Sequence, residues 1–273
     1  MSKLEFFTDP VHAAFTFGEG QVGALLVHGF GGTPADIWQL GRRLGEMGCT
    51  AYGPSLPGFA RDIARLEKCG REDWLVAVRE TWQRVRAAHP TTILIGYSMG
   101  GALALHAAVE HPPDRLVLLA PFTRLRGLLV QLVPLARHFR KNYYPYENAD
   151  FSDPSLRQDL ATIAPGADLD DPAVQQALRQ QVRIPLDAVH ELMQLGKNAL
   201  RLAPEVQAPT LVVQGKQDPT VKAEDTRTLV RQMPAGTLYH EIDANHHLSQ
   251  GNAPYHRQVF PLVLDFLGDV LKD

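Results

Sequence analysis

A serine with a glycine two residues away on each side is the clearest chemical feature of this 273-residue sequence. Ser98 lies between Gly96 and Gly100, after the apolar run 93–95 and before the apolar stretch 100–109. This pattern predicts a buried strand, a sharp turn and a closely packed helix, with the serine presented at the bend. Side chains at the two glycine positions would collide with the neighbouring strand or helix. The pattern indicates a nucleophilic serine, and an ordinary strand-to-helix turn is the alternative.

An aspartate and a histidine follow later strand-like runs. Asp218 comes after the apolar run 209–214, and His246 comes after the run 237–242. A serine hydroxyl is a weak nucleophile at neutral pH, so a histidine must take its proton and a carboxylate must orient that histidine. The carboxyl ends of parallel strands meet at one edge of a sheet, where ligands bind. We therefore predict that Ser98, Asp218 and His246 form a catalytic triad.

A second glycine-rich segment, His28-Gly29-Phe30-Gly31-Gly32, follows the apolar run 22–27. Its glycines allow the backbone to turn amides inward. In acyl-transfer enzymes, a loop of this kind supplies one hydrogen-bond donor to a developing oxyanion. The alternative is a plain turn between a strand and a helix.

The elements that must position these residues alternate between apolar strands and amphipathic helices. This alternation predicts an α/β fold with a mostly parallel, twisted sheet of about seven or eight strands flanked by helices. The expected strands are 22–27, 49–53, 93–95, 115–120, 209–214 and 237–242, and the expected helices are 35–48, 73–88, 100–109 and 254–271. Two short strands, 4–8 and 13–17, are expected to form an antiparallel edge. Pro261 is expected to kink the last helix, because it removes a backbone donor.

The alternation breaks between about 122 and 205, where no clear buried strand occurs and two apolar helices are expected at 125–136 and 186–202. A structureless loop of this length would be implausible in a compact domain. We therefore predict a helical cap at 122–205, inserted into a core made of 1–121 and 206–273. The alternative is that these helices simply continue the α/β winding.

Composition excludes several classes of protein. A formal net charge of −3 and scattered basic residues provide no face for nucleic acid. No signal peptide is recognisable at the N-terminus, and no apolar run is long enough to span a membrane, so a soluble, cytoplasmic protein is expected. Cys49 and Cys69 are expected to be free thiols. Trp74 and Trp82 lie at helical spacing, which indicates packing rather than a substrate site.

Taken together, these motifs resemble the α/β-hydrolase superfamily, and within it the small bacterial carboxylesterases and monoacylglycerol lipases. The resemblance covers nearly the whole chain and includes the cap. It is carried by the segments 28–32, 96–101 and 245–246 and by the spacing from Gly215 through Asp218 to Val221. The resemblance implies that no metal or organic cofactor is needed.

The resemblance also assigns roles to particular residues. It implies that the backbone amides of Phe30 and Met99 bind the oxyanion. It aligns His246, rather than the adjacent His247, with the catalytic histidine. His247 would then be a neighbour that packs or orients.

The predicted activity is hydrolysis of small-molecule carboxylic esters with short- to medium-chain acyl groups, through an acyl-enzyme on Ser98. The acyl pocket is expected in the cap, although its apolar side chains could instead only hold the cap to the sheet. Two other classes stay open: hydrolysis of carbon–carbon bonds or haloperoxidase-like chemistry on the same triad, and a non-catalytic ligand-binding protein. The sequence makes no prediction of oligomeric state. The side chains expected to bind substrate are Leu129, Leu132, Val189 and Met193.

Overall fold

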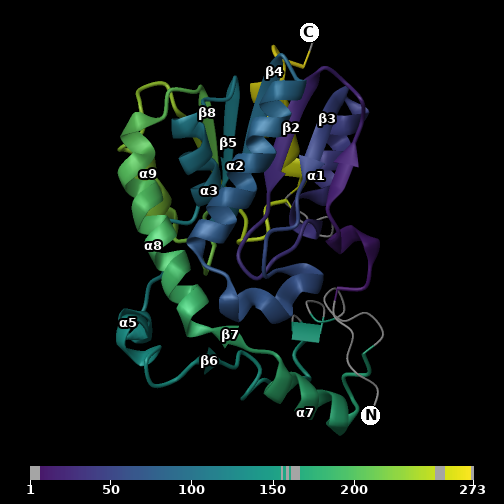
Figure 1. Cartoon of the computed structure of the whole chain (residues 1–273), viewed down its shortest axis with the longest axis vertical. Coiled ribbons are helices and arrows are strands. Elements are labelled where there is room, and N and C mark those ends of the chain that lie inside the picture. Colours follow the sequence, from purple (N-terminus) through teal and green to yellow (C-terminus); the bar gives the residue numbers. More distant parts are fainter. Residues whose placement is uncertain (1–6, 155, 158–159, 161–166, 250–255, 272–273) are drawn as a thin grey trace.

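The computed structural model describes residues 7–154, 156–157, 160, 167–249 and 256–271. Seven strands form one sheet in the order β1-β3-β2-β4-β5-β8-β9, in which β1 is antiparallel to β3 and the other pairs are parallel (Figure 1). The predicted mostly parallel sheet is therefore confirmed. The strands are β1 (Phe15–Phe17), β2 (Val22–Val27), β3 (Cys49–Gly53), β4 (Thr91–Tyr97), β5 (Arg115–Leu119), β8 (Thr210–Gly215) and β9 (Leu238–Ile242).

Two helical layers cover the two faces of the sheet. Successive side chains of a strand point to opposite faces, so Leu25 and Val27 of β2 pack with α2 and α3, while Ala24 and Leu26 pack with α1 and α10. Both faces of β2 and β8 are buried, which explains why these strands are apolar without alternation. The covering helices are α1 (Ala35–Glu46), α2 (Arg71–Ala88), α3 (Met99–Glu110), α9 (Ala223–Val230) and α10 (His256–Leu267), and a 3-10 segment, η2 (Ala60–Lys68), precedes α2.

The buried tryptophans and cysteines behave as the sequence predicts. Trp74 and Trp82 of α2 are fully buried in the core between α2, α3 and the sheet, so the packing interpretation is confirmed. Cys49 and Cys69 are both buried and free. Burial raises the pKa of the Cys49 thiol to about 11. A buried thiol of this kind is unreactive at neutral pH.

Between β5 and β8, no strand of the described chain joins the main sheet. This interval holds α4 (Leu128–Gln131), α5 (Val133–Ala136), β6 (Asn142–Tyr143), α7 (Pro172–Gln181), β7 (Ile184–Pro185) and α8 (Leu186–Leu202). Strands β6 and β7 pair with each other as a separate ribbon, which the sequence did not predict. In Figure 1, α5, β6, β7 and α7 lie below the sheet.

The two helices predicted in this interval have different outcomes. The helix expected at 186–202 is α8, and its side chains Leu192, Leu195 and Ala199 belong to the main core against α3. The single helix expected at 125–136 is instead two short helices, α4 and α5. Pro134 lies in the first turn of α5, where it has no N–H to continue a longer helix.

The N-terminal edge differs from the expected pair of strands. Strand β1 pairs with β3 rather than with a preceding strand. Most of the expected strand 4–8 lies outside the described residues, and Phe7 and Thr8 are not in a strand. Their carbonyls accept hydrogen bonds from the guanidinium of Arg61 in η2.

Candidate active site

Ser98 occupies the bend between β4 and α3. Its backbone has φ 54° and ψ −118°, a conformation that L-residues rarely adopt. A Cβ placed on Gly96 would lie 2.3 Å from the Gly100 carbonyl oxygen, and one on Gly100 would lie 2.1 Å from the Val27 carbonyl oxygen. Both glycines are therefore required by close backbone contacts, as the sequence pattern predicts.

The structure brings the three predicted triad residues together. The imidazole Nε2 of His246 lies 3.1 Å from Ser98 Oγ, and its Nδ1 lies 2.7 Å from Asp218 Oδ2. Asp218 follows β8 and His246 follows β9, at the same edge of the sheet as Ser98. These distances match a hydrogen-bonded nucleophile, base and orienting carboxylate.

The carboxylate of Asp218 is held by four hydrogen bonds. Its Oδ1 accepts from the backbone N–H groups of Thr220 and Val221, each at 2.8 Å. Its Oδ2 accepts from His246 and from the side-chain amide of Gln214 at 3.1 Å. Burial acts to raise the pKa of Asp218, but the hydrogen bond and charge of His246 and the two backbone donors outweigh it, so the net pKa is lowered. The carboxylate is therefore ionised at neutral pH.

The loop that carries His246 is fixed by contacts to neighbouring strand ends. The hydroxyl of Tyr97, the residue before the serine, donates to the backbone carbonyl of His246 at 3.1 Å, and the two rings lie 5.2 Å apart. Ser249 Oγ donates to the backbone carbonyl of Asp36 in α1 at 2.6 Å. These bonds connect the histidine loop to β4 and α1.

His247 lies beside the triad but does not join it. Its backbone N–H donates to Asn245 Oδ1 at 2.9 Å, and its ring centre is 6.3 Å from that of His246. We therefore expect His246→Ala to lower ester turnover by roughly 10⁴-fold or more, and His247→Ala to keep most of it. Steady-state rates on a p-nitrophenyl ester measure both. The assignment of the two histidines would be reversed if His247→Ala lost activity and His246→Ala kept it.

The glycine-rich loop after β2 lies directly against Ser98. Val27 is paired with Gly96 in the parallel sheet, so the residues that follow each strand are neighbours. A Cβ placed on Gly29 would lie 3.1 Å from Ser98 Cβ. The amide of Phe30 therefore belongs to a loop beside Ser98. Met99 is the first residue of α3, so its N–H has no partner within the helix and is free to donate to an anion.

His28 holds this loop in place, a role that the sequence analysis did not assign. Its buried Nδ1–H donates to the Gly29 carbonyl at 2.9 Å, and its Nε2 accepts from the Leu56 N–H at 3.2 Å. Burial lowers the pKa of His28 to about 4, so the ring is neutral and can accept at Nε2. The sequence feature that could have indicated this role is the position of His28, since it is a polar residue directly after an apolar strand.

The side chains predicted to bind substrate have different environments. Val189 and Met193 lie half-buried on α8. The side chain of Leu129 lies outside the described residues. Leu132 exposes 55% of its surface. Its side chain therefore lies largely in solvent, and its role in substrate binding stays a prediction.

Helix α8 is connected to Ser98 indirectly, because it packs on residues 122–123, which follow β5. The Phe122 N–H donates to the Ser98 carbonyl at 3.0 Å. A Cβ on Gly196 of α8 would lie 2.6 Å from the Thr123 carbonyl oxygen and 2.7 Å from the Phe122 ring. Helix α8 therefore packs directly on the segment that is hydrogen-bonded to Ser98.

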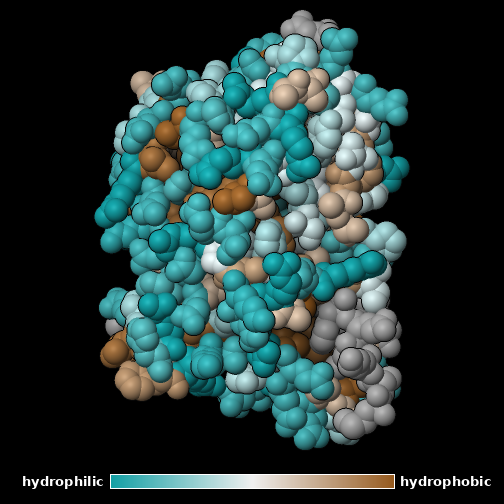
Figure 2. All heavy atoms as spheres, viewed as in Figure 1, coloured by the Kyte–Doolittle hydropathy of each residue, from teal (hydrophilic) through white to brown (hydrophobic). Residues whose placement is uncertain are grey.

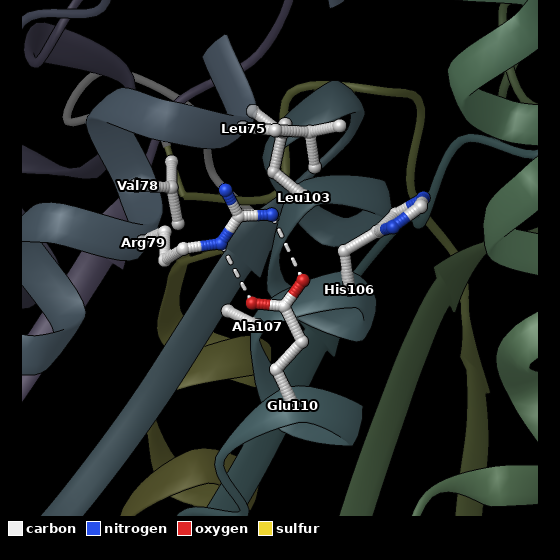
Figure 3. A pocket seen from close by; sticks show the side chains of 7 residues that line it. All are labelled: Leu75, Val78, Arg79, Leu103, His106, Ala107 and Glu110. Atoms are coloured by element: carbon white, nitrogen blue, oxygen red, sulfur yellow. Dashed lines mark hydrogen bonds and ion pairs between the residues drawn. The ribbon is translucent and has the colours of Figure 1, made fainter. Parts of the chain in front are cut away.

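A hollow between α2 and α3 lies away from this site (Figure 3). Its lining includes the Arg79–Glu110 ion pair, which has N–O distances of 2.7 and 2.9 Å, and His106, about two turns along α3 from Ser98. Its interior has room for about one water molecule. It is therefore too small to hold an ester substrate.

Other chemistry is limited within the described part of the chain. No group of three or more His, Cys, Asp or Glu side chains there is arranged to hold a metal ion. No helix among those residues is both long enough and apolar enough to cross a membrane.

Comparison with known proteins decides the family. The model of the Hydrolase_4 family (serine aminopeptidase, S33) matches residues 22–249. The chain belongs to the Hydrolase_4 family. The matched range contains Ser98, Asp218 and His246, and the fold is the α/β-hydrolase fold, as the sequence motifs predicted.

Relatives of this Hydrolase_4 chain include esterases and lipases. A carboxylesterase from Bacillus subtilis (strain 168) is 23% identical over 85% of this chain and 82% of that enzyme. A thermostable monoacylglycerol lipase from Bacillus sp. (strain H-257) is 37% identical over 34% of this chain and 37% of that lipase. The crystal structure of a Paleococcus ferrophilus monoacylglycerol lipase shares the fold, with a TM-score of 0.69 and 17% identity over 97% of this chain and 99% of that chain.

Proposed function

We propose that this Hydrolase_4 member is a serine hydrolase that cleaves carboxylic esters of short- to medium-chain acyl groups. The observation that carries the proposal is the hydrogen-bond chain from Asp218 through His246 to Ser98. The esterase and lipase relatives support the same substrate class. The substrate is a small-molecule ester, and every catalytic group in the proposed reaction comes from this chain, with water as the second reactant.

In the proposed reaction, Ser98 Oγ attacks the ester carbonyl carbon while His246 Nε2 takes the hydroxyl proton. The negative oxygen of the tetrahedral intermediate accepts hydrogen bonds from the Phe30 and Met99 amides. When the carbonyl reforms, the bond to the alcohol breaks and His246 returns the proton to the leaving oxygen. A water molecule then attacks the acyl carbon while His246 takes one of its protons. The bond to Ser98 Oγ breaks, His246 returns the proton to that oxygen, and the acid is released.

Residues 122–205 would act as a cap on a core formed by 1–121 and 206–273. The cap would hold the acyl chain, with Val189 and Met193 of α8 as lining residues and Leu129 as a further candidate. This placement is supported by the packing of α8 on the segment bonded to Ser98.

A fluorophosphonate probe tests the proposed nucleophile. Covalent labelling of Ser98, identified by mass spectrometry of the labelled peptide, is expected for wild type and absent for Ser98→Ala. A panel of acyl esters then defines the class. Cleavage of aminoacyl anilides or of carbon–carbon bonds without ester cleavage would contradict an ester hydrolase.

Acyl-chain selectivity should depend on α8. Each methylene buried against the cap contributes up to about 0.8 kcal/mol, or roughly fourfold in kcat/KM. We expect p-nitrophenyl butyrate and hexanoate to be better substrates than acetate. Met193→Trp should lower kcat/KM for the longer esters by about tenfold and for acetate much less, because the larger ring occupies the chain's space.

Lys197→Trp provides a matched control, since Lys197 lies exposed on the same helix. It should leave the chain-length profile unchanged. A flat profile in wild type, or one that a folded Met193→Trp variant does not alter, would place the acyl pocket elsewhere.

A further inference from the structure

The segment around α5 turns three large apolar side chains outward. The Ala136 N–H donates to the Leu132 carbonyl and the Arg140 N–H to the Ala136 carbonyl, at 2.7 and 2.8 Å, so the helical spacing continues past α5. Leu132, Leu135 and Phe139 are 55%, 63% and 84% exposed. Their i, i+3, i+7 spacing places them on one face, which we call the outer face.

The opposite side of this segment is attached to α8. Val133 is buried, and the Arg137 guanidinium donates to Asp187 Oδ1 of α8 at 2.8 Å. These contacts fix which side points away from the protein. A helical segment normally turns its apolar side inward, so the inversion leaves large apolar side chains in water and indicates a partner for the outer face.

The chain segment that carries the outer face is rich in positive charge, although Arg137 on its other side is paired with Asp187 of α8. No Asp or Glu occurs between Asp114 and Glu147, whereas Arg140 and Lys141 follow Phe139 directly and are exposed. One carboxylate reaches this group, since Glu147 lies 3.4 Å from Arg140 and both side chains are more than half exposed. Such a pair is weak in water. Figure 2 shows hydrophobic residues at the surface at the lower left, where Figure 1 places α5.

We propose that the outer face, with Arg140 and Lys141, docks on an anionic lipid surface. Exposed leucine and phenylalanine side chains beside lysine and arginine are the composition of segments that lie in the membrane interface. The apolar groups would enter the acyl boundary, while the two cations would contact phosphate headgroups. The proposal does not depend on the ester hydrolase activity.

Vesicle sedimentation of the full chain tests this docking. Wild type is expected to bind vesicles of phosphatidylcholine mixed with phosphatidylglycerol, and to bind pure phosphatidylcholine more weakly. The double variant Leu135→Ser/Phe139→Ser should bind the mixed vesicles at least tenfold more weakly, because two apolar side chains are lost. Arg140→Gln/Lys141→Gln should lose the preference for the anionic lipid, and added salt should weaken wild type in the same direction.

Leu238→Ser is the matched control, because Leu238 is 47% exposed on β9. It should bind vesicles as wild type does. The substituted positions are exposed, so folding should be kept, and hydrolysis of a soluble p-nitrophenyl ester should be unchanged by Leu135→Ser/Phe139→Ser. Equal vesicle binding by that variant and wild type would overturn the proposal. A second result would also overturn it: wild type forms a dimer in sedimentation velocity and binds no lipid, and the double variant is a monomer. The partner of the outer face would then be a second copy of this chain.

A different observation, at the triad carboxylate, supports a second inference. Gln214 is fully buried at the end of β8, and its Nε2 lies within 3.1 Å of three acceptors: Asp218 Oδ2, the Gly215 carbonyl and the Val221 carbonyl. Its Oε1 accepts from Thr226 Oγ at 2.7 Å. The amide must turn its NH₂ toward these acceptors, because the flipped amide would place its oxygen against all three of them. Its two N–H groups are shared among the three acceptors, one of which is Asp218 Oδ2.

We infer that Gln214 is a positioning residue for the acid of the triad, an inference that rests on the proposed function. A hydrogen bond donated to the carboxylate favours its ionised form and leaves Oδ2 facing His246. Two further titratable groups of the described residues interact with Asp218: Tyr97, whose pKa is raised by burial and by nearby carboxylates, and Lys222, whose Nζ donates to the Asp218 carbonyl at 3.3 Å. None of these replaces the amide donor at Oδ2.

The pH dependence of turnover distinguishes positioning from a structural role. Gln214→Leu removes one donor to a charged group, so kcat is expected to fall by about tenfold to a hundredfold with little change in KM. Loss of the donor raises the pKa of Asp218, so the acid limb of kcat/KM should move to higher pH. Gln214→Glu keeps the shape of the side chain and should move the acid limb in the same direction. This variant provides the test if Gln214→Leu does not fold.

Gln217→Leu is the control, because the exposed Gln217 binds Asp243 and not the triad. It should match wild type in kcat and in pH profile. An unchanged kcat and acid limb in folded Gln214 variants would overturn the positioning role while leaving the ester hydrolase proposal standing. Failure of the proposed function itself would instead appear as an inactive, unlabelled wild type.

Discussion

Ser98→Ala is expected to lower ester turnover by on the order of 10⁴-fold or more while leaving the fold intact. The hydroxyl is the atom that would form the acyl bond, and it is the group that His246 Nε2 contacts at 3.1 Å. Steady-state kinetics and fluorophosphonate labelling measure the loss. Ser152→Ala, at an exposed serine between α5 and α7, is the control and should retain full activity. Turnover retained by Ser98→Ala would contradict the nucleophile assignment.

The backbone conformation of Ser98 leads to a second prediction, which concerns the stability of variants at this position. A non-glycine residue at φ 54° carries strain of order 1 kcal/mol or more. Alanine keeps that strain, whereas Ser98→Gly removes it. We therefore expect Ser98→Gly to be inactive but about 1 kcal/mol more stable than Ser98→Ala in urea unfolding. Equal stability of the two variants would show that the bend is not strained.

The positions of the three candidate triad residues followed from the sequence because each comes soon after a strand-like run, which is apolar before Ser98 and Asp218 and mixed before His246. Strands such as β2 and β8 are buried on both faces, so their residues are apolar throughout and easily recognised. Adjacent parallel strands then bring their carboxyl ends together. The pairing of Val27 with Gly96, which places the Gly29 loop against the serine, depends on strand register and is visible only in the structure.

Polar residues buried beside the site were harder to predict. Gln214 and His28 each lie at the end of an apolar strand, and their value comes from specific partners that are distant in sequence, such as Thr226 and Leu56. A polar side chain in a fully buried strand was the available signal. Because buried polar groups are hydrogen-bonded, this signal indicates that the side chain has a partner. It does not indicate which residue that partner is.

The region between β5 and β8 was predicted least well, for a physical reason. Apolar residues at helical spacing show that one face is hydrophobic, but not whether that face meets the protein or another partner. Leu132 was expected in a pocket and instead is exposed beside Leu135. The two-residue strands β6 and β7 are too short to produce a pattern.

Asp218→Asn should also lower turnover by on the order of 10⁴-fold, because of the donors that surround the side chain. Oδ1 accepts two backbone N–H groups, and Oδ2 accepts from Gln214 and His246. An asparagine has one carbonyl oxygen, so its NH₂ must face one of these pairs. With the oxygen held by the backbone donors, the NH₂ faces His246 and favours the tautomer protonated at Nε2, which cannot accept the serine proton.

The pH dependence of stability separates this effect from simple unfolding. The pKa of Asp218 is lowered in the folded protein, so its ionisation stabilises the fold above the pKa of the unfolded chain, and this contribution is lost as pH falls through the folded value. The amide of the Asp218→Asn variant cannot titrate, so the stability gap between wild type and this variant should be largest near neutral pH and shrink below about pH 4. Urea unfolding at several pH values measures the gap. A gap independent of pH, or a variant with near wild-type turnover, would show that the carboxylate charge is not what orients His246.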